Sequence, residues 1–376
     1  MSSAVSFSPV KRRELEYRGY PKQKSRAQLR LIQWVITVEF RFLRVNLREL
    51  FPEVHHLRQE GFMESKFTLP FISAQAVESA FPLRTAMETQ RTVFSAFDRG
   101  EAVMGKRGVI PNGIDASFAY IARASQDGPT IVKFGSVTNS NASRNLPVVH
   151  AYISILDTLT GALTTFIDGE SVTRIRTTAA SMVAAEVLAS KTKNIAVIGA
   201  GLQGMAHARA ALELFSPNSL ILVTRSASLE AEKLKNENSK VHISDDLTDA
   251  ISKSDLIFLC TNTIKPIVTN AFKEGTTVIS IGSFSPNREE IAGDVVASAD
   301  LIFGDDSQTI QTQCGSVVAA LKIKPALENR ITSLGTLINN PALGRTSANQ
   351  VVLYFSVGLG IQDASIVEKF LELEKK

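Results

Sequence analysis

The segment Gly199-Ala-Gly-Leu-Gln-Gly204 constrains the fold more than any other feature of the sequence. An apolar run at residues 194–198 precedes it, and a helix-forming stretch at 202–214 follows it. In a strand–turn–helix unit of this kind the first glycine permits the tight turn, the second lets the backbone approach a pyrophosphate, and the third lets helix and strand pack closely. The free N–H groups at the start of the helix would bind the phosphates. The segment therefore predicts a dinucleotide-binding unit.

Short apolar runs recur at regular spacing from the glycine turn onward. Segments of helix-forming length separate them, and they lie at residues 195–198, 220–223, 255–259, 277–281 and 301–303. Buried strands that alternate with helices are typical of a parallel sheet with helices on both faces. The pattern predicts an α/β chain with a Rossmann unit, that is, a doubly wound parallel sheet.

The residues before the turn follow a different pattern. β-Branched and aromatic residues at period two over 130–134, 148–156 and 162–167 predict a half-buried antiparallel sheet. We expect one helix capped by Ser73 and running to Phe97, a second over 172–189, and C-terminal helices over 350–360 and 365–373 that rejoin the first domain. The predicted parts are a basic leader (1–62), a first domain (63–190), a nucleotide-binding domain (191–335) and the C-terminal helices (336–376).

The basic excess of the chain lies in its first 62 residues. Twelve Lys and Arg residues stand there against six Glu, so the remainder is slightly acidic and does not favour nucleic acid as a partner. The leader fits a targeting segment, a surface-binding arm, or sequence upstream of a start at Met63. We favour the last interpretation, because a domain-like opening begins at Met63 and the leader's glutamates weaken the transit interpretation.

Several function classes find no support in the composition. No run approaches the roughly 18 apolar residues of a membrane span. Cys260 and Cys314 form no disulfide framework, and neither they nor the scattered histidines have metal-ligand spacing. We therefore predict no metal site, no membrane partner and a cytoplasmic location.

The end of the second parallel strand bears on the choice of cofactor. An acidic residue at this place would bind the ribose hydroxyls of NAD, but the chain has Thr224, Arg225 and Ser226. An arginine beside two hydroxyls favours a 2′-phosphate, so we expect NADP in preference to NAD, unless Arg225 is only a solvated loop residue. Thr261 and Asn262, just past the strand at 255–259, lie where ligands bind in open α/β sheets. The candidate cofactor-binding residues are thus Gly199, Gly201, Gln203, Gly204, Thr224, Arg225, Ser226, Thr261 and Asn262.

The stretch from Thr160 to Ser181, with its Asp-Gly-Glu-Ser-Val-Thr and Arg-Thr-Thr-Ala-Ala motifs, resembles the ornithine cyclodeaminase and mu-crystallin family. The resemblance extends over nearly all of residues 63–376, including Asn145-Leu-Pro147 and the segment from Phe355 to Asp363. It implies a Rossmann domain inserted into an α+β domain that binds substrate, is completed by the C-terminal helices, and forms a homodimer.

The resemblance also implies a substrate site. In that family basic residues of the first domain hold the substrate's carboxylate, and the matching positions here are Arg107, Lys133 and Arg176. Chemistry supports the assignment, because a guanidinium binds a carboxylate through two parallel hydrogen bonds and a lysine on an apolar strand needs a reason to face inward. Lys133 could instead show its polar side to water, and Arg107 could be a plain loop residue. Asp168 and Thr173 fall in the family's Asp-Gly-x-x-x-Thr pattern, and we expect Asp168 first of all to cap the following helix.

Two departures from the family's pattern bear on the reaction. Cyclodeaminases of the family resemble one another in an aspartate where this chain has Phe284, and in a glutamate for which Ala119 stands at the nearest alignment. Without these carboxylates, deamination has no obvious acid and base. The Gly-Ser-Phe-x-Pro form resembles members that reduce cyclic imino acids.

We therefore expect an NAD(P)H-dependent reductase of a ketimine such as pyrroline-2-carboxylate or piperideine-2-carboxylate. Three alternatives stay open. They are an ornithine cyclodeaminase, an amino acid or opine-type dehydrogenase, and a non-catalytic NADP-binding protein like mu-crystallin.

Overall fold

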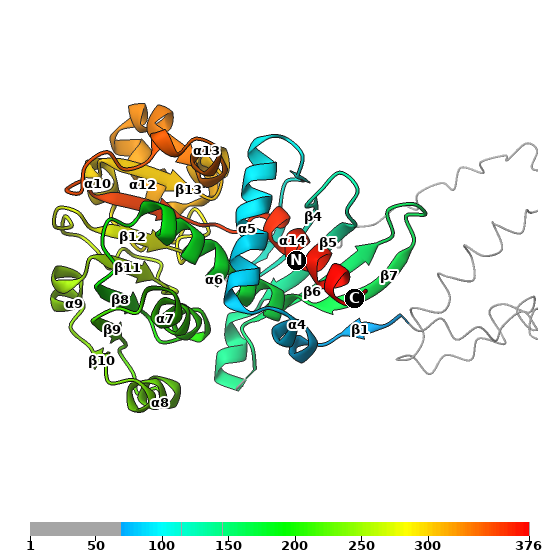
Figure 1. Ribbon diagram of the computed structural model, residues 1–376, viewed down its shortest axis with the longest axis horizontal. Helices are drawn as coiled ribbons and strands as arrows, with labels where there is room; N and C mark the ends of the chain where they lie inside the picture. Colours follow the sequence, from blue (N-terminus) through cyan, green and yellow to red (C-terminus); the bar gives the residue numbers. More distant parts are fainter. Residues whose placement is uncertain (1–68, 114, 145, 376) are drawn as a thin grey trace, which may run out of the picture. The chain divides into compact units, whose positions relative to one another are not determined.

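The computed structural model describes residues 69–113, 115–144 and 146–375. Within them two sheets form the framework, and Figure 1 shows helix α6 (Gly169–Leu188) running between the two. This helix packs against both, contacting strand β6 (Val149–Leu156) of one sheet and β12 (Thr277–Ser280) of the other. The predictions for the basic leader and for a start at Met63 lie outside the described residues.

The first sheet (β1–β7) has the order β1-β7-β6-β5-β4-β2, with β3 paired to β4. Its strands are antiparallel except for the parallel pair of β1 and β7, so the antiparallel sheet predicted from period-two alternation is confirmed. The remaining strands are β1 (Phe71–Ile72), β2 (Val103–Met104), β3 (Gly108–Asn112), β4 (Asp115–Arg123), β5 (Thr130–Val137) and β7 (Leu163–Asp168).

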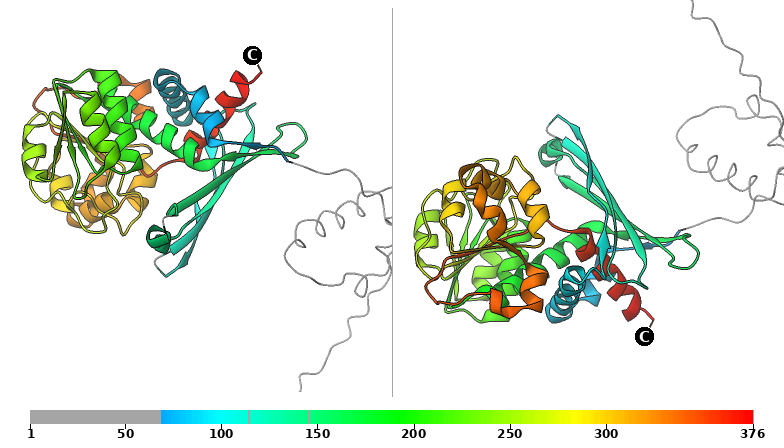
Figure 2. Two further views of the ribbon diagram at one scale, coloured as in Figure 1. Left: turned by 90° about the horizontal axis from the view of Figure 1, so that it is seen from below. Right: turned by 90° about the horizontal axis from the view of Figure 1, so that it is seen from above.

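Helices cover one face of the first sheet, as Figure 2 shows from two sides. α4 (Ala74–Ala80), α6 and α14 (Gly360–Leu373) contact the sheet, and α5 (Leu83–Asp98) packs against α6 and α14. The predicted single helix to Phe97 is divided in two at Pro82, because proline lacks an N–H group and disfavours helical backbone at the residue before it. The predicted caps are confirmed, since Ser73 Oγ accepts from Ala76 N at 3.4 Å and Asp168 Oδ1 from Ser171 N at 2.7 Å.

The parallel sheet (β8–β15) has the order β10-β9-β8-β11-β12-β15-β13-β14, and all its pairs are parallel. The chain leaves β8 toward β9 and later returns to β11 on its other side, which makes the β8–β11 junction a topological switch point. Its other strands are β8 (Asn194–Ile198), β9 (Ser219–Val223), β10 (Val241–Ser244), β11 (Leu256–Leu259), β13 (Leu301–Gly304), β14 (Ile331–Ser333) and β15 (Val352–Phe355). Its helices are α7 (Leu202–Phe215), α8 (Leu229–Glu237), α9 (Leu247–Lys253), α10 (Gly293–Ser298), α11 (Ser307–Gln313), α12 (Gly315–Ile323) and α13 (Leu334–Asn339).

The predicted helix over 350–360 is wrong. Residues Val352–Phe355 form β15, which is fully buried between β12 and β13. A short apolar run fits a buried parallel strand as well as a helix, so periodicity alone does not separate the two. The parallel sheet consequently continues beyond the run at 301–303, the last one predicted, and the C-terminal segment contributes a strand to it before α14 packs on the first sheet. The limits predicted for the domains stay predictions.

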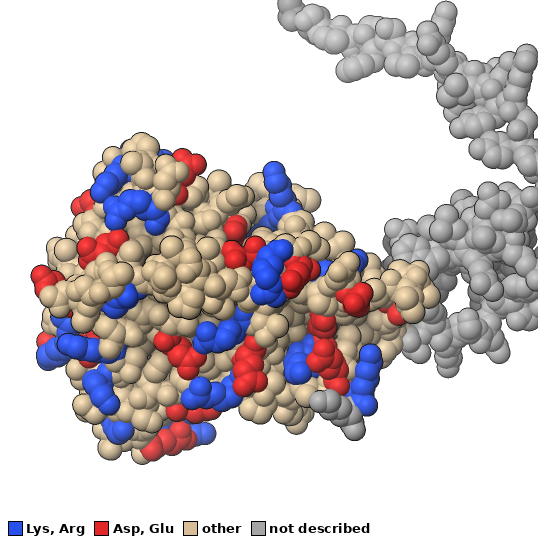
Figure 3. Space-filling view, turned by 45° about the horizontal axis from the view of Figure 1, so that its top comes forward, with Lys and Arg blue, Asp and Glu red and all other residues tan. Residues whose placement is uncertain are grey.

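The surface shows no separation of charge on the face drawn in Figure 3, where acidic and basic side chains are interspersed. None of the helices in the described part of the chain has the length and apolar character needed to cross a bilayer.

Candidate functional site

Four strand ends of the parallel sheet meet at one edge. Leu259 of β11 lies beside both Ile198 of β8 and Ser280 of β12, and Ser280 lies beside Phe355 of β15. The turns that follow these strands are therefore neighbours at the carboxyl edge, where ligands bind in open α/β sheets. The site is built from these turns and from the cationic side chains of the first sheet and α6.

The glycine turn after β8 has the geometry that a bound dinucleotide requires. Gly199 has a φ of +106°, and a Cβ atom there would lie 2.6 Å from Cys260 O. A Cβ on Gly204 would lie 1.7 Å from Gly199 O, whereas a Cβ on Gly201 would meet nothing within 4 Å. Close packing thus explains two of the glycines, and the open space beside Gly201 fits the approach of a phosphate. Gln203 lies in the first turn of α7, and its Oε1 is buried without a hydrogen-bond partner in the described residues.

The three candidate residues after β9 line a pocket of about 330 Å³. Arg225 and Ser226 are exposed, and Thr224 Oγ1 donates to Ser226 O at 2.9 Å. The pocket also contains two carboxyl groups, Glu232 and Asp245. Arg225 is therefore the one cationic residue among those lining this pocket, and two carboxyl groups accompany it.

A buried carboxylate, Glu290, organises the turns after β11 and β12. Its Oε1 accepts hydrogen bonds from Thr261 N at 2.7 Å and Thr261 Oγ1 at 2.6 Å, and its Oε2 accepts from Ser280 Oγ at 2.8 Å and Gly282 N at 2.7 Å. Burial raises the pKa of Glu290. The side chain of Thr261 is thus hydrogen-bonded to Glu290, and it supports the turn after β11.

A phenylalanine and an arginine lie beyond these turns. The Arg288 guanidinium carbon lies 5.0 Å from the centre of the Phe284 ring and its Nη1 donates to Asn262 Oδ1. Asn262 is therefore held by Arg288, and Phe284, under a cation, occupies the place where the family resemblance implies an aspartate in cyclodeaminases.

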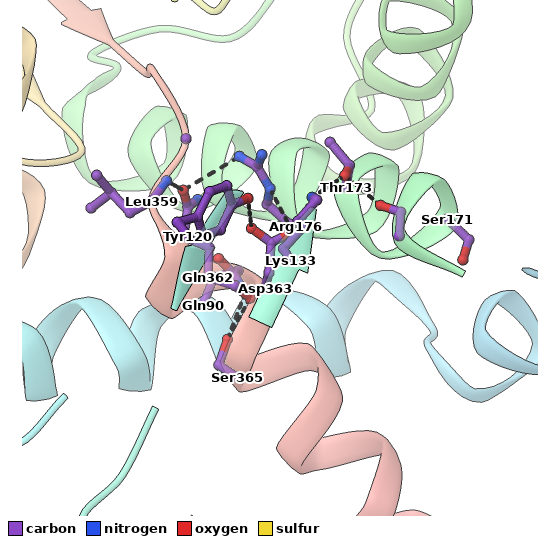
Figure 4. Close-up of polar contacts among 12 residues, drawn as sticks. Gln90, Tyr120, Lys133, Ser171, Thr173, Arg176, Leu359, Gln362, Asp363 and Ser365 are labelled. Carbon is purple, nitrogen blue, oxygen red and sulfur yellow. Dashed lines mark hydrogen bonds and ion pairs between the residues drawn. The ribbon is translucent and has the colours of Figure 1, made fainter. Parts of the chain in front are cut away.

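Two of the three predicted cations, Lys133 and Arg176, lie against one carboxylate, Asp363 of α14 (Figure 4). Lys133 Nζ lies 2.6 Å from Asp363 Oδ1, and Arg176 Nε lies 3.5 Å from the same oxygen. Tyr120 OH donates to Asp363 Oδ2 at 2.8 Å. Arg107 lies over the Tyr120 ring, 5.3 Å from its centre. Strands β4 and β5, helix α6 and helix α14 thus each bring one group to a single cluster.

Neighbouring side chains and carbonyls fix the directions of the cations. Lys133 Nζ also donates to Thr173 Oγ1 at 2.5 Å, which places the threonine of the Asp-Gly-x-x-x-Thr pattern in the cluster. Arg107 Nη2 donates to Gly358 O at 2.5 Å and to Val357 O at 3.3 Å, in the turn after β15. Lys133 is 2% exposed, so the alternative that it faces water is wrong.

Cations outnumber carboxylates in this cluster, because Lys133 and Arg176 share Asp363 and the half-buried Arg107 lies over the Tyr120 ring. Burial lowers the pKa of Lys133 to about 8, although Asp363 opposes this shift. Burial alone would raise the pKa of Asp363, but Lys133, Arg176 and the Tyr120 hydroxyl together hold it below its usual value. The excess of positive charge is suited to binding an anion, since buried charges are costly unless paired.

Several residues of the cluster do not appear among the sequence candidates. Asp363 and Gln362 lie in the segment that carries the family resemblance, but nothing in the sequence alone indicates their contacts. Tyr120 faces Lys133 across the β4–β5 pair, whereas Ala119 is exposed on the opposite face. The period-two alternation of a strand therefore places Tyr120, not Ala119, beside the cations.

We expect Gly201→Ala to separate cofactor binding from stability. The added methyl group meets no protein atom within 4 Å, so the melting temperature should stay within about 1 °C, but the methyl would fill the space beside the phosphates. Fluorescence titration with NADH and NADPH should show affinity reduced by about tenfold or more. Unchanged affinity for both would contradict the placement of the cofactor at this turn.

Comparison with known proteins agrees with this architecture. The curated relatives include a Δ1-pyrroline-2-carboxylate reductase from Bacillus cereus, 24% identical over 308 residues, which spans 80% of this chain and 94% of the relative. An iminosuccinate reductase from Paracoccus denitrificans is 25% identical over 318 residues, spanning 81% of this chain and 92% of the relative.

A solved structure shares the fold. It is Δ1-pyrroline-2-carboxylate reductase from Thermococcus litoralis in complex with NADH and L-proline, with a TM-score of 0.76 and 24% identity, covering 82% of this chain and 98% of the other. The profile of the ornithine cyclodeaminase/mu-crystallin family matches residues 71–373. This match covers almost the whole described chain, and the protein belongs to the ornithine cyclodeaminase/mu-crystallin family.

Proposed function

We propose that the protein is an NAD(P)H-dependent reductase of α-imino acids, with a cyclic ketimine such as pyrroline-2-carboxylate or piperideine-2-carboxylate as substrate. The observation that carries the proposal is the buried cluster in which Arg107, Lys133 and Arg176 outnumber Asp363. Two relatives are named as reductases of pyrroline-2-carboxylate and of iminosuccinate, and these names support the same reaction class.

Arg107, Lys133 and Arg176 would bind the substrate's carboxylate and thereby orient the imine. A guanidinium suits this task because it donates two parallel hydrogen bonds to a carboxylate. Asp363 and Thr173 keep the Lys133 ammonium group directed into the cluster. With a pKa of about 8, Lys133 carries its proton at neutral pH and can also exchange it with a substrate nitrogen.

The cofactor would supply the hydride from its nicotinamide ring when it is bound. The imine carbon would accept this hydride, and the electron pair of the C=N double bond would move to the protonated nitrogen, which would become the amine. Because a protonated imine next to a carboxylate is already electrophilic, positioning is the main task of the protein. Phe284 contributes an apolar ring where a deaminating enzyme needs a carboxylate, which favours reduction over ammonia release.

We propose NADP as the preferred cofactor, with Arg225 binding its 2′-phosphate. Support comes from the position of Arg225 in the pocket at the end of β9, together with the hydroxyl-bearing residues there. The solved relative from Thermococcus litoralis holds NADH, and Glu232 and Asp245 in the same pocket would suit ribose hydroxyls. Because NADH lacks the 2′-phosphate, Arg225→Ala should lower the affinity for NADPH and leave the affinity for NADH unchanged.

The test of the proposed reaction is oxidation of NADPH and NADH, followed by nicotinamide absorbance, with both cyclic imino acids. We expect turnover that favours NADPH, and a roughly hundredfold lower kcat/KM in Lys133→Met because a buried charge is lost. Lys322→Met, at an exposed position on α12, is the matched control and should keep the activity of the wild type.

Other outcomes would identify the alternatives. Ammonia release from ornithine without net cofactor consumption would indicate a cyclodeaminase. Stoichiometric cofactor turnover with an acyclic amino acid, or with a keto acid and an amine, would indicate a dehydrogenase. Tight cofactor binding with no turnover of any of these compounds would contradict an enzymatic role and favour a crystallin-like protein.

We also propose that the protein is a homodimer formed through the outer face of the first sheet. Ile121, Phe134 and Tyr152 are exposed there, with Phe134 and Tyr152 ring centres 6.1 Å apart and Phe71 6.5 Å from Tyr152. A contiguous exposed apolar patch of this kind is typical of a protein interface, and a two-fold axis would place the same patch on both copies.

Sedimentation velocity should then show a dimer at micromolar concentration. Phe134→Glu places a charge in the patch and should yield a monomer with unchanged circular dichroism. A wild-type monomer, or a Phe134→Glu variant that is still dimeric, would contradict the proposed interface.

A further inference from the structure

We propose that Asp305 is a positioning residue for the carboxylate-binding cluster, and this role rests on the function proposed above. Asp305 follows β13 and is 1% exposed. It touches none of the three cations directly. It acts through the turn 356–358, which follows β15 and carries the contacts of two of them.

Three donors of this turn converge on one oxygen of Asp305. Its Oδ2 accepts from Ser356 Oγ at 3.1 Å, Val357 N at 2.8 Å and Gly358 N at 2.7 Å. Its Oδ1 accepts from Asp306 N at 3.0 Å. No cation pairs with this carboxylate in the described residues, so hydrogen-bond donors alone stabilise it.

The same turn contacts both arginines of the cluster. The carbonyl oxygens of Val357 and Gly358 accept from Arg107 Nη2. Gly358 has a φ of +79°, and a Cβ atom there would lie 2.6 Å from Arg176 Nη1. Arg176 thus packs against the backbone of a glycine whose conformation Asp305 holds. A shift of the turn would displace Arg107 and remove the wall beside Arg176.

The carboxylate cannot be replaced by an amide without loss. Asparagine offers one oxygen, and its NH₂ group would face either the donors of the turn or the Asp306 N–H. A buried donor left unpaired is costly, and hydrogen bonds to charged groups are stronger than those to neutral groups. Asp305→Asn should therefore loosen the turn while it conserves volume.

Glu290 provides a matched control, because it is the equivalent buried carboxylate on the cofactor side. It is fully buried, accepts four hydrogen bonds, and holds Thr261 and Gly282 rather than the turn 356–358. We expect Asp305 to determine the geometry of the substrate cluster and Glu290 that of the cofactor turns.

The experiment measures three quantities in the wild type, Asp305→Asn and Glu290→Gln. They are amide hydrogen exchange over residues 352–360, the Kd of pyrrole-2-carboxylate and the Kd of NADPH. Pyrrole-2-carboxylate carries a carboxylate but cannot be reduced like a ketimine. Asp305→Asn should accelerate exchange in this segment and raise the Kd of pyrrole-2-carboxylate about ten- to hundredfold, with the Kd of NADPH within about twofold of wild type. Glu290→Gln should weaken NADPH binding and leave exchange at 352–360 unchanged.

The outcomes separate the two proposals. Faster exchange with unchanged pyrrole-2-carboxylate binding in Asp305→Asn overturns the positioning role, as does unchanged exchange. Wild-type protein that does not bind pyrrole-2-carboxylate at all refutes the proposed function, whatever the exchange shows. If circular dichroism shows that Asp305→Asn does not fold, Ser356→Ala removes one of the three donors instead. It should accelerate exchange over 352–360 and raise the Kd of pyrrole-2-carboxylate, both to a smaller extent. Their absence in that folded variant overturns the role of Asp305.

Discussion

The buried excess of positive charge around Asp363 is the constraint on which the rest of the site depends. Lys133 and Arg176 share one oxygen of Asp363, and Arg107 lies over the ring of Tyr120. One carboxylate does not neutralise three cations, and the low dielectric of the interior makes the imbalance costly. A substrate carboxylate would halve the excess charge, from two to one, and the same contacts would orient the proposed imino acid.

The position of β15 connects this cluster to the cofactor edge. The strand lies inside the parallel sheet, and its end leads through the turn 356–358 directly into α14, which carries Asp363. Backbone from the parallel sheet therefore contacts Arg107, in the connection between β2 and β3, within a few residues of the end of β15. The two sheets share one site because the chain returns through the sheet, and this is also why a buried carboxylate such as Asp305 can influence cations that it does not touch.

The parts of the site that depend on local sequence could be predicted, and the parts that depend on distant contacts could not. The glycine turn was predictable because its roles lie within one strand–turn–helix unit. Lys133 was predictable as an inward-facing residue because a lysine interrupts an apolar strand. Asp363 was not, since its partner Lys133 lies 230 residues away, and β15 was mistaken for a helix because four apolar residues show no distinguishing period.

The charge of Lys133 is tested most directly by the pH dependence of pyrrole-2-carboxylate binding, measured with cofactor bound. Burial lowers the pKa of Lys133 from 10.5 to about 8, so the positive charge is present below pH 8 and is lost as the pH rises through that value. Affinity should be constant from about pH 6 to 7 and fall as the pH rises through 8, and Lys133→Met should bind weakly with no such dependence. A Lys133→Met variant that binds pyrrole-2-carboxylate as tightly as the wild type, or with the same pH profile, would contradict a binding role for the Lys133 ammonium group.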